Sequence, residues 1–177
     1  MSLKDLTWEH HKNAERQKFV KVMFSGSIDS KLYAEFLFNQ HMAYDLLEVM
    51  AMSHGIFNGM EDVRRAPKIL ADFKELWPKD QTLPEPKNAT KTYLDHLLTI
   101  KDNKDALMAH VYVRHMGDLS GGQMIRKKVP GAGTMFDFAD KDQAKEIIRS
   151  RINDSMADEA KKCFDFATGL FQDMLND

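Results

Sequence analysis

The sequence is poor in features that would each define a class of protein. It has a single cysteine, Cys163, which excludes an internal disulfide framework and is typical of a reducing compartment. It has no apolar run near the roughly 18 residues of a membrane span, and its first fifteen residues lack the apolar segment of a signal peptide. We therefore expect a soluble, cytoplasmic protein with no membrane partner.

Neither sign of charge prevails, because 25 Lys and Arg residues are balanced by 27 Asp and Glu residues. This composition gives no bulk attraction to nucleic acid, and we expect no nucleic-acid partner. The stretch LSGGQ at 119–123 is similar to the signature of transporter ATPases, but the chain has no Gly-Lys pair and so no GxxxxGK[ST] phosphate loop. Nucleotide binding is therefore excluded.

Period-two alternation is also scarce, whereas apolar residues recur at three- and four-residue spacing. The pattern predicts an all-α fold with one domain over residues 1–177. Ser30 and Asp140 are candidate N-caps. The predicted helices cover residues 2–24, 30–58 with a break, 61–77, 90–101, 104–128 and 140–174.

Three glycines stand out in the predicted helix 104–128, at Gly117, Gly121 and Gly122. Each costs about 1 kcal/mol of helix propensity relative to Ala, which favours a functional reason over simple packing. Gly117 and Gly121 are four residues apart and share a helix face, so a planar ligand could lie on bare backbone there. Asp118 is next to this face, and Arg114 could orient its carboxylate from one turn earlier.

The seven histidines lack the spacing of a helical metal site. No two are three or four residues apart and none follows an acidic residue by three, which excludes HExxH zinc and ExxH di-iron patterns. A metal would then use one histidine, as heme iron does, although a surface or core role is the simpler alternative. His11 is the best candidate, because Glu15 could fix its ring from one turn later. His10 points about 100° away and is expected in solvent.

These motifs resemble the heme (haem) oxygenase family, in its short bacterial and photosynthetic form. The pattern Tyr-x-Arg-x-x-Gly-Asp-Leu-Ser-Gly-Gly-Gln is complete over residues 112–123, and the resemblance spans residues 4–171. Three positions depart from the family: Trp8 replaces a second Lys, His115 a frequent aromatic residue and Ala167 a frequent Asn. The other matching residues are Lys4, Thr7, His11, Ala14 and Glu15, then Tyr44 and Glu48, then Lys145, Arg149, Arg151 and Asn153, and last Leu170 and Phe171.

The resemblance implies that heme is both cofactor and substrate. Its ring would be opened with O2 and electrons from a partner to give biliverdin, expected as the IX-alpha isomer, with carbon monoxide and ferrous iron. His11 would ligate the iron, and Gly117 and Gly121 would let a distal helix approach the ring. Asp118 would order water and supply protons, with Arg114 and Tyr44 organising that network.

The resemblance also implies a set of heme-binding residues around the pocket. Lys145 and Arg149 would hold propionates, although a solvated face paired with Asp142 and Glu146 is the alternative. The remaining predicted contacts are Lys4, Tyr112 and Glu15, with Phe164 and Phe171 as pocket walls or, alternatively, as core packing.

Arg126, Lys127 and Lys128 follow the glycines, where the dipole at a helix C-terminus favours cations. Alternatively they would dock an acidic electron donor, which the resemblance implies is a ferredoxin. A bilin reductase would be a downstream partner. Two other classes of protein stay open. A non-enzymatic heme carrier needs His11 but not Asp118, and a cofactor-free helical interaction protein needs neither.

Overall fold

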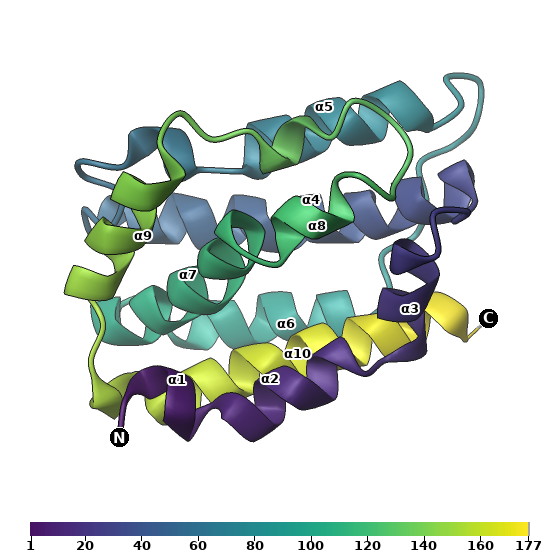
Figure 1. Ribbon diagram of the computed structural model, residues 1–177. Coiled ribbons are helices and arrows are strands. Elements are labelled where there is room, and N and C mark those ends of the chain that lie inside the picture. Colours follow the sequence, from purple (N-terminus) through teal and green to yellow (C-terminus); the bar gives the residue numbers. More distant parts are fainter. Residues whose placement is uncertain (177) are drawn as a thin grey trace.

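The computed structural model describes residues 1–176, and all regular secondary structure there is helical, which confirms the all-α prediction (Figure 1). The last residue of the predicted domain 1–177 lies outside this range. In chain order the helices are α1 (Leu3–Leu6), α2 (Trp8–Glu15), α3 (Lys18–Phe24), α4 (Ser30–Ser53), η1 (Glu61–Val63), α5 (Ala66–Leu76), α6 (Asn88–Thr99), α7 (Lys104–Leu119), α8 (Gly122–Ile125), η2 (Thr134–Phe136), α9 (Lys141–Ser150), η3 (Asp154–Met156) and α10 (Ala157–Leu175), where η marks a 3-10 helix.

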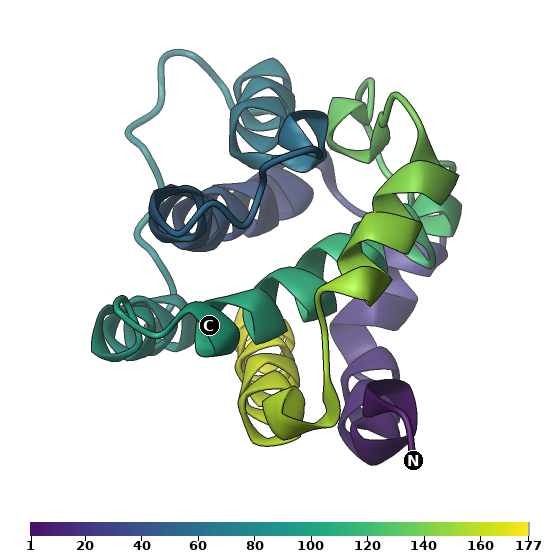
Figure 2. The ribbon, with the colours of Figure 1, turned by 90° about the vertical axis from the view of Figure 1, so that its left-hand side faces the viewer.

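Helix α7 runs through the middle of the molecule, where its own side chains are largely buried. It packs against α10, α4 and α9, while α10 also packs against α2, α3 and α6. Figure 2 shows α4 and α6 toward the left-hand end of α7, and α2 and α9 toward its right-hand end. Residues of α7 can therefore connect groups that lie on both sides of the fold.

The predicted helix 2–24 is divided into α1, α2 and α3, which corrects the expectation of one continuous helix. The first break falls at Thr7 and the second at Gln17, whose backbone is extended (φ -63°, ψ 145°). After Gln17 the chain turns so that Phe19 and Met23 are buried in the core. Burial of these apolar side chains therefore outweighs the helical pattern of the sequence.

Helix α4 begins and ends differently from the predicted 30–58. Its N-cap is Asp29 and not Ser30, because the Asp29 carboxylate accepts a hydrogen bond from the Leu32 backbone N–H at 3.0 Å. It continues without a break to Ser53. There Gly55 takes a left-handed conformation (φ 72°), and Ile56 N–H bonds back to the Ala51 carbonyl, a terminating pattern that favours glycine.

The other predicted helices are found with different bounds. The 61–77 prediction becomes η1 and α5, and the 90–101 prediction becomes α6. The 140–174 prediction is wrong as one helix, since the chain breaks at residues 151–153 between α9 and η3. The Arg151 guanidinium bonds to the Ile56 and Asn58 carbonyls, which holds this break in place. The Asp140 cap is confirmed by its bond from Gln143 N–H at 3.0 Å.

Candidate functional site

The glycine segment is not one helix, which corrects the prediction for 104–128. Helix α7 ends at Leu119, Ser120 leaves helical geometry (φ -115°, ψ -96°), and Gly121 precedes the short α8. Gly117 and Gly121 are nevertheless both exposed, and no atom lies within 4 Å of where a Cβ would stand on either. Two patches of bare backbone therefore face open space.

Gly122 has a different role from the other two glycines. A Cβ there would lie 3.0 Å from Phe136 Cε1 and 3.1 Å from the Gly117 carbonyl oxygen. Gln123 strengthens the same packing, because its amide donates to the Asp118 carbonyl at 3.0 Å and to the Phe136 carbonyl at 2.8 Å. Gly122 and Gln123 thus fix the turn that presents the two bare glycines.

Asp118 lies beside this turn as a buried carboxylate, only 8% exposed. The Tyr44 hydroxyl, from α4, donates a hydrogen bond to its Oδ2 at 2.7 Å. Burial raises the pKa of Asp118 to about 6, although His115 and the Tyr44 hydrogen bond act in the opposite direction. A carboxyl with such a pKa can both take up and release a proton near neutral pH.

Arg114 does not pair directly with Asp118 in the described structure, contrary to the expectation from their spacing. Its Nε donates to the Tyr93 hydroxyl at 3.1 Å, and its Nη1 to the Gln40 side-chain oxygen at 3.5 Å. Its guanidinium lies 4.3 Å from the centroid of the Tyr93 ring. Arg114 acts on Asp118 through its charge, which is among the causes that lower the pKa of that carboxyl.

Tyr93 is a further residue of this network, and the sequence alone does not indicate it. It belongs to α6, and it is fully within the core at 2% exposure. Nothing in the local sequence marks it, because its contact with Arg114 joins residues 21 positions apart. A buried tyrosine hydroxyl needs a partner, but sequence spacing does not say which.

The second motif residue on α4, Glu48, ties three helices together. Its carboxylate accepts hydrogen bonds from the backbone N–H groups of Arg65 (2.6 Å) and Ala66 (3.0 Å) at the start of α5. His115 Nε2, from α7, is 2.8 Å from the same carboxylate. His115 stands where the family frequently has an aromatic residue. Here it forms a fully buried polar contact between α7 and α4, and its partner Glu48 is one helical turn from Tyr44.

His11 lies on α2 with 36% of its side chain exposed. Its ring stacks on Phe164 at a centroid distance of 5.2 Å, and the Trp8 ring meets it edge-on at 5.4 Å. Glu15 lies next to it as predicted, but the nitrogen that contacts Glu15 Oε1 at 2.8 Å is Nε2. For Nε2 to bind a metal, the contact between Nε2 and Glu15 must break, and Glu15 can then accept a hydrogen bond from Nδ1 instead.

Two predictions for α2 and α10 need correction. His10 is not simply in solvent, because its Nδ1 is 2.8 Å from Asp165 Oδ1 on α10. Phe171 packs with core aromatic residues, at ring centroid distances of 6.2 Å from Phe19 and 6.0 Å from Phe36. Of the predicted pair of aromatic walls, only Phe164 lies beside His11.

Lys145 and Arg149 lie on α9, on the same side of the molecule as α2 (Figure 2). Within residues 1–176 neither forms an ion pair with an acidic side chain, so the alternative of pairing with Asp142 and Glu146 is not observed. Tyr112 is close enough to Arg149 for that charge to lower its pKa, although burial raises the pKa more strongly. Lys4 is exposed on α1.

The basic residues after the glycines line a cavity of about 680 Å³. They follow the short helix α8, whose C-cap is Arg126, and not α7, which ends seven residues earlier at Leu119. Arg126 also forms an ion pair with Asp137. The lining residues are Phe24, Gln123, Met124, Arg126, Lys127, Lys128 and Lys141.

These features fit a large, flat, anionic ligand with a metal centre. His11 offers a partly exposed imidazole, Gly117 and Gly121 offer backbone without side chains, and Lys145 and Arg149 offer positive charge. Heme has this combination of flat ring, iron and carboxylates. No helix in the described part of the chain is long and apolar enough to cross a membrane.

Comparison with known proteins agrees with this assignment. The family model described as Heme oxygenase matches residues 1–173, so the chain belongs to the heme oxygenase family. A heme oxygenase of Pyropia yezoensis is 31% identical over 81% of this chain and 66% of that protein. Heme oxygenase 2 of Synechocystis is 30% identical over 87% of this chain and 70% of that protein. The chain thus spans about two thirds of the length of these relatives.

Solved structures show the same fold. The structure of heme oxygenase-2 from Synechocystis in complex with heme and NO has a TM-score of 0.84 and 26% identity, covering 97% of this chain and 83% of that chain. The structure of heme oxygenase from Leptospira interrogans has a TM-score of 0.80 and 27% identity, covering 97% of this chain and 98% of that one.

Proposed function

We propose that this chain is a heme oxygenase that opens heme to biliverdin, carbon monoxide and ferrous iron. Membership of the family supports this activity, and so does the presence of a candidate iron ligand and bare backbone in one fold. The observation that carries the proposal is Asp118, a buried carboxyl hydrogen-bonded to Tyr44 directly beside Gly117. A heme carrier has no need of a proton-exchanging group at that position.

His11 is the proposed iron ligand. When bound, heme supplies the iron that activates O2 and the ring that is cleaved. For iron to bind Nε2, Glu15 would have to accept its hydrogen bond from Nδ1 instead, where a carboxylate would fix the tautomer that leaves Nε2 free. Phe164 and Trp8 flank the imidazole and limit its rotation.

The distal groups are proposed to hold water and deliver protons. Asp118, with a pKa of about 6, takes a proton from water and returns it on the heme side. Tyr44 keeps the carboxyl in one orientation by donating to Oδ2. Arg114 is held on the far side by Tyr93 and Gln40, so its fixed positive charge favours the ionised carboxylate after each transfer.

Positive side chains are proposed to hold the propionates. Lys145 and Arg149 are like charges one helical turn apart, an arrangement that an anion between them would stabilise. Tyr112 would add a hydroxyl next to Arg149, and Lys4 a further cation from α1. The propionates would then fix the rotation of the ring, and so the choice of the IX-alpha isomer.

The electron donor is proposed to be an acidic protein of the ferredoxin class, acting in the cytoplasm and followed by a bilin reductase. The basic cavity supports this docking mode, because Lys127, Lys128 and Lys141 lie together around exposed Met124. A cationic surface with an apolar centre favours association with an acidic partner at low salt.

The test is to mix the full chain with heme, O2 and a ferredoxin reducing system. We expect the heme absorption to be lost, the biliverdin band to appear, and carbon monoxide to be released in equal amount. Heme that stays bound and intact under the same conditions would support the carrier alternative instead. The same reaction is repeated with ascorbate as the reductant. Biliverdin formed with ascorbate but not with ferredoxin would mean that only the choice of electron donor is wrong.

A further inference from the structure

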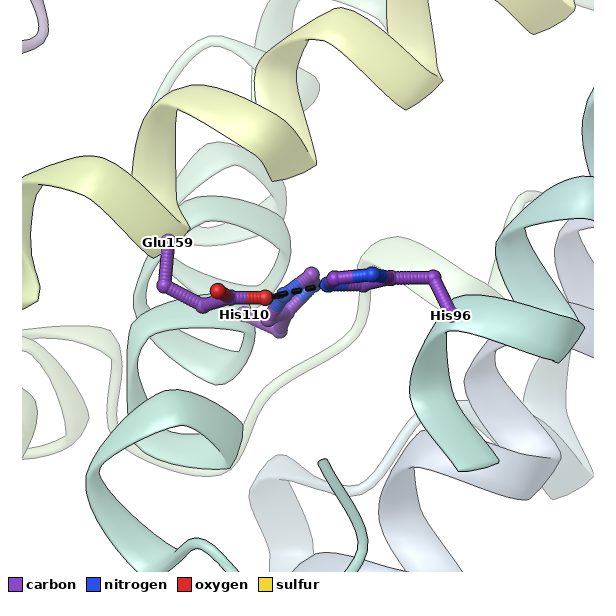
Figure 3. A group of neighbouring side chains, drawn as sticks. All are labelled: His96, His110 and Glu159. Atoms are coloured by element: carbon purple, nitrogen blue, oxygen red, sulfur yellow. Dashed lines mark hydrogen bonds and ion pairs between the residues drawn. The ribbon is translucent and has the colours of Figure 1, made fainter. Parts of the chain in front are cut away.

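Two histidines and a glutamate converge from three helices (Figure 3). His96 comes from α6, His110 from α7 and Glu159 from α10. One ligand atom from each, the Nε2 atoms of the histidines and a carboxylate oxygen, lie within 4.8 Å of one another. Glu159 Oε1 is 2.9 Å from His110 Nε2 and is also hydrogen-bonded to His96 Nε2.

Two imidazoles and a carboxylate are a ligand set that binds zinc and related divalent ions. In a tetrahedral zinc site the ligand atoms are about 3.3 Å apart, so an ion here requires the 2.9 Å pair of His110 and Glu159 to open by about half an ångström and the closer pair of His96 and Glu159 to open further. The side chains of His96 and Glu159 are 18% and 15% exposed, while that of His110 is fully buried. Two of the three side chains are therefore partly accessible to solvent.

The orientation of His110 also suits a metal ligand. Its Nδ1 is 2.8 Å from the Tyr93 hydroxyl, whose oxygen can accept a hydrogen bond from Nδ1–H and so leave the Nε2 lone pair free. Metal-bound histidines are usually held in this way through their other nitrogen. Tyr93 is itself fixed by the Arg114 Nε at 3.1 Å, so the ring of His110 is preorganised.

We propose that His96, His110 and Glu159 form a binding site for a divalent transition-metal ion of the zinc class, separate from the heme site. The simpler alternative is that Glu159 only accepts hydrogen bonds from the two imidazoles, which satisfies all three groups without an ion. The pairwise spacing of histidines along the chain does not reveal this site, because its ligands lie on three different helices.

The test is calorimetric titration of the full chain with zinc sulfate, with magnesium sulfate as a negative control. We expect one zinc ion to bind, and His96→Ala and Glu159→Gln each to weaken it by at least about 10-fold. His54→Ala and His11→Ala are controls that each remove a histidine outside the proposed site. Both variants should bind zinc at the site of His96 with wild-type affinity. Melting temperatures check folding, and His96 is partly exposed, so its removal should leave the fold intact.

Tyr93→Phe separates a metal site from chance binding at exposed histidines. It keeps all three ligands and removes the hydroxyl that contacts His110 Nδ1 and also accepts from Arg114 Nε, so it should weaken zinc binding by about 10-fold. Zinc affinity that is the same in wild type, His96→Ala and Glu159→Gln would overturn the proposal, as would a wild-type chain that binds no zinc. Heme binding does not depend on these residues as ligands, so either outcome leaves the proposed activity to its own test.

Discussion

Asp118 shows how burial sets the chemistry of a single residue. Its pKa is raised from the ordinary aspartate value of 3.8 to about 6 because the ionised form loses solvent, and nearby groups restore only part of that loss. At pH 7 the ionised carboxylate is poorly solvated in the folded protein, which lowers the free energy of unfolding. A residue that costs stability in this way is expected to have a function.

This cost should be visible in the pH dependence of stability. Between about pH 4 and pH 6 the folded state keeps the Asp118 proton and the unfolded state does not, so stability falls as pH rises through that range. Asp118→Asn has no such titration. The wild type loses stability over this range and the variant does not. We therefore expect the free energy of unfolding of Asp118→Asn, relative to that of wild type, to increase by up to about 3 kcal/mol from pH 4 to pH 7. Urea unfolding across this range measures it, and a pH-independent difference contradicts the burial argument.

The ligand role of His11 can be tested at the same scale. His11→Ala should abolish the absorption spectrum of histidine-ligated heme, and added imidazole should restore it by entering the space left by the ring. His10→Ala is the matched control, because His10 is held by Asp165. If His10→Ala loses the spectrum and His11→Ala keeps it, the assignment of the iron ligand is wrong.

At the scale of elements, the end of α7 separates glycines that serve packing from glycines that serve a ligand. Gly122 has close neighbours, whereas Gly117 and Gly121 have none within 4 Å. All three lack the positive φ that would favour glycine for backbone reasons. Only the surroundings of each position therefore explain why it is glycine.

Substitution by alanine should have opposite effects on stability at Gly122 and at the two exposed glycines. Gly122→Ala should destabilise the protein by about 1–3 kcal/mol, because the new methyl group meets Phe136 and a backbone carbonyl. Gly117→Ala should be neutral or stabilising by up to about 1 kcal/mol, yet weaken heme binding. Gly121→Ala should behave like Gly117→Ala. Thermal unfolding and heme titration measure both effects, and unchanged heme affinity in both variants would leave the bare backbone without a role.

The sequence pattern was sufficient for the fold class and for the Asp140 cap, because helical periodicity and capping are local. It failed at the ends of α4 and α9, where Gly55 and the bonds of Arg151 to a distant loop decide where the helix stops. The same limit applies to the site. The distal motif contains Asp118, but its hydrogen bond to Tyr44 spans 74 residues and has no local signal.

At the scale of the whole molecule, cationic side chains lie on α9 and around the cavity beside α8, although the net charge is only -2. The double variant Lys145→Ala with Arg149→Ala should weaken heme binding and yield mixed biliverdin isomers, because the propionates lose their partners. Lys101→Ala, in the turn before α7, controls for lost charge elsewhere. Chromatography of the products measures the isomers, and one unchanged isomer at unchanged affinity would return α9 to an ordinary solvated face.

The central claim is that Asp118, beside the bare glycines, makes this fold an oxygenase and not a carrier. Its most direct test compares wild type with Asp118→Ala in heme turnover, following biliverdin by absorbance while heme binding is titrated in parallel. We expect Asp118→Ala to bind heme through His11 with near wild-type affinity and to form biliverdin at less than about one hundredth of the wild-type rate. Biliverdin formation by Asp118→Ala at the wild-type rate would contradict it.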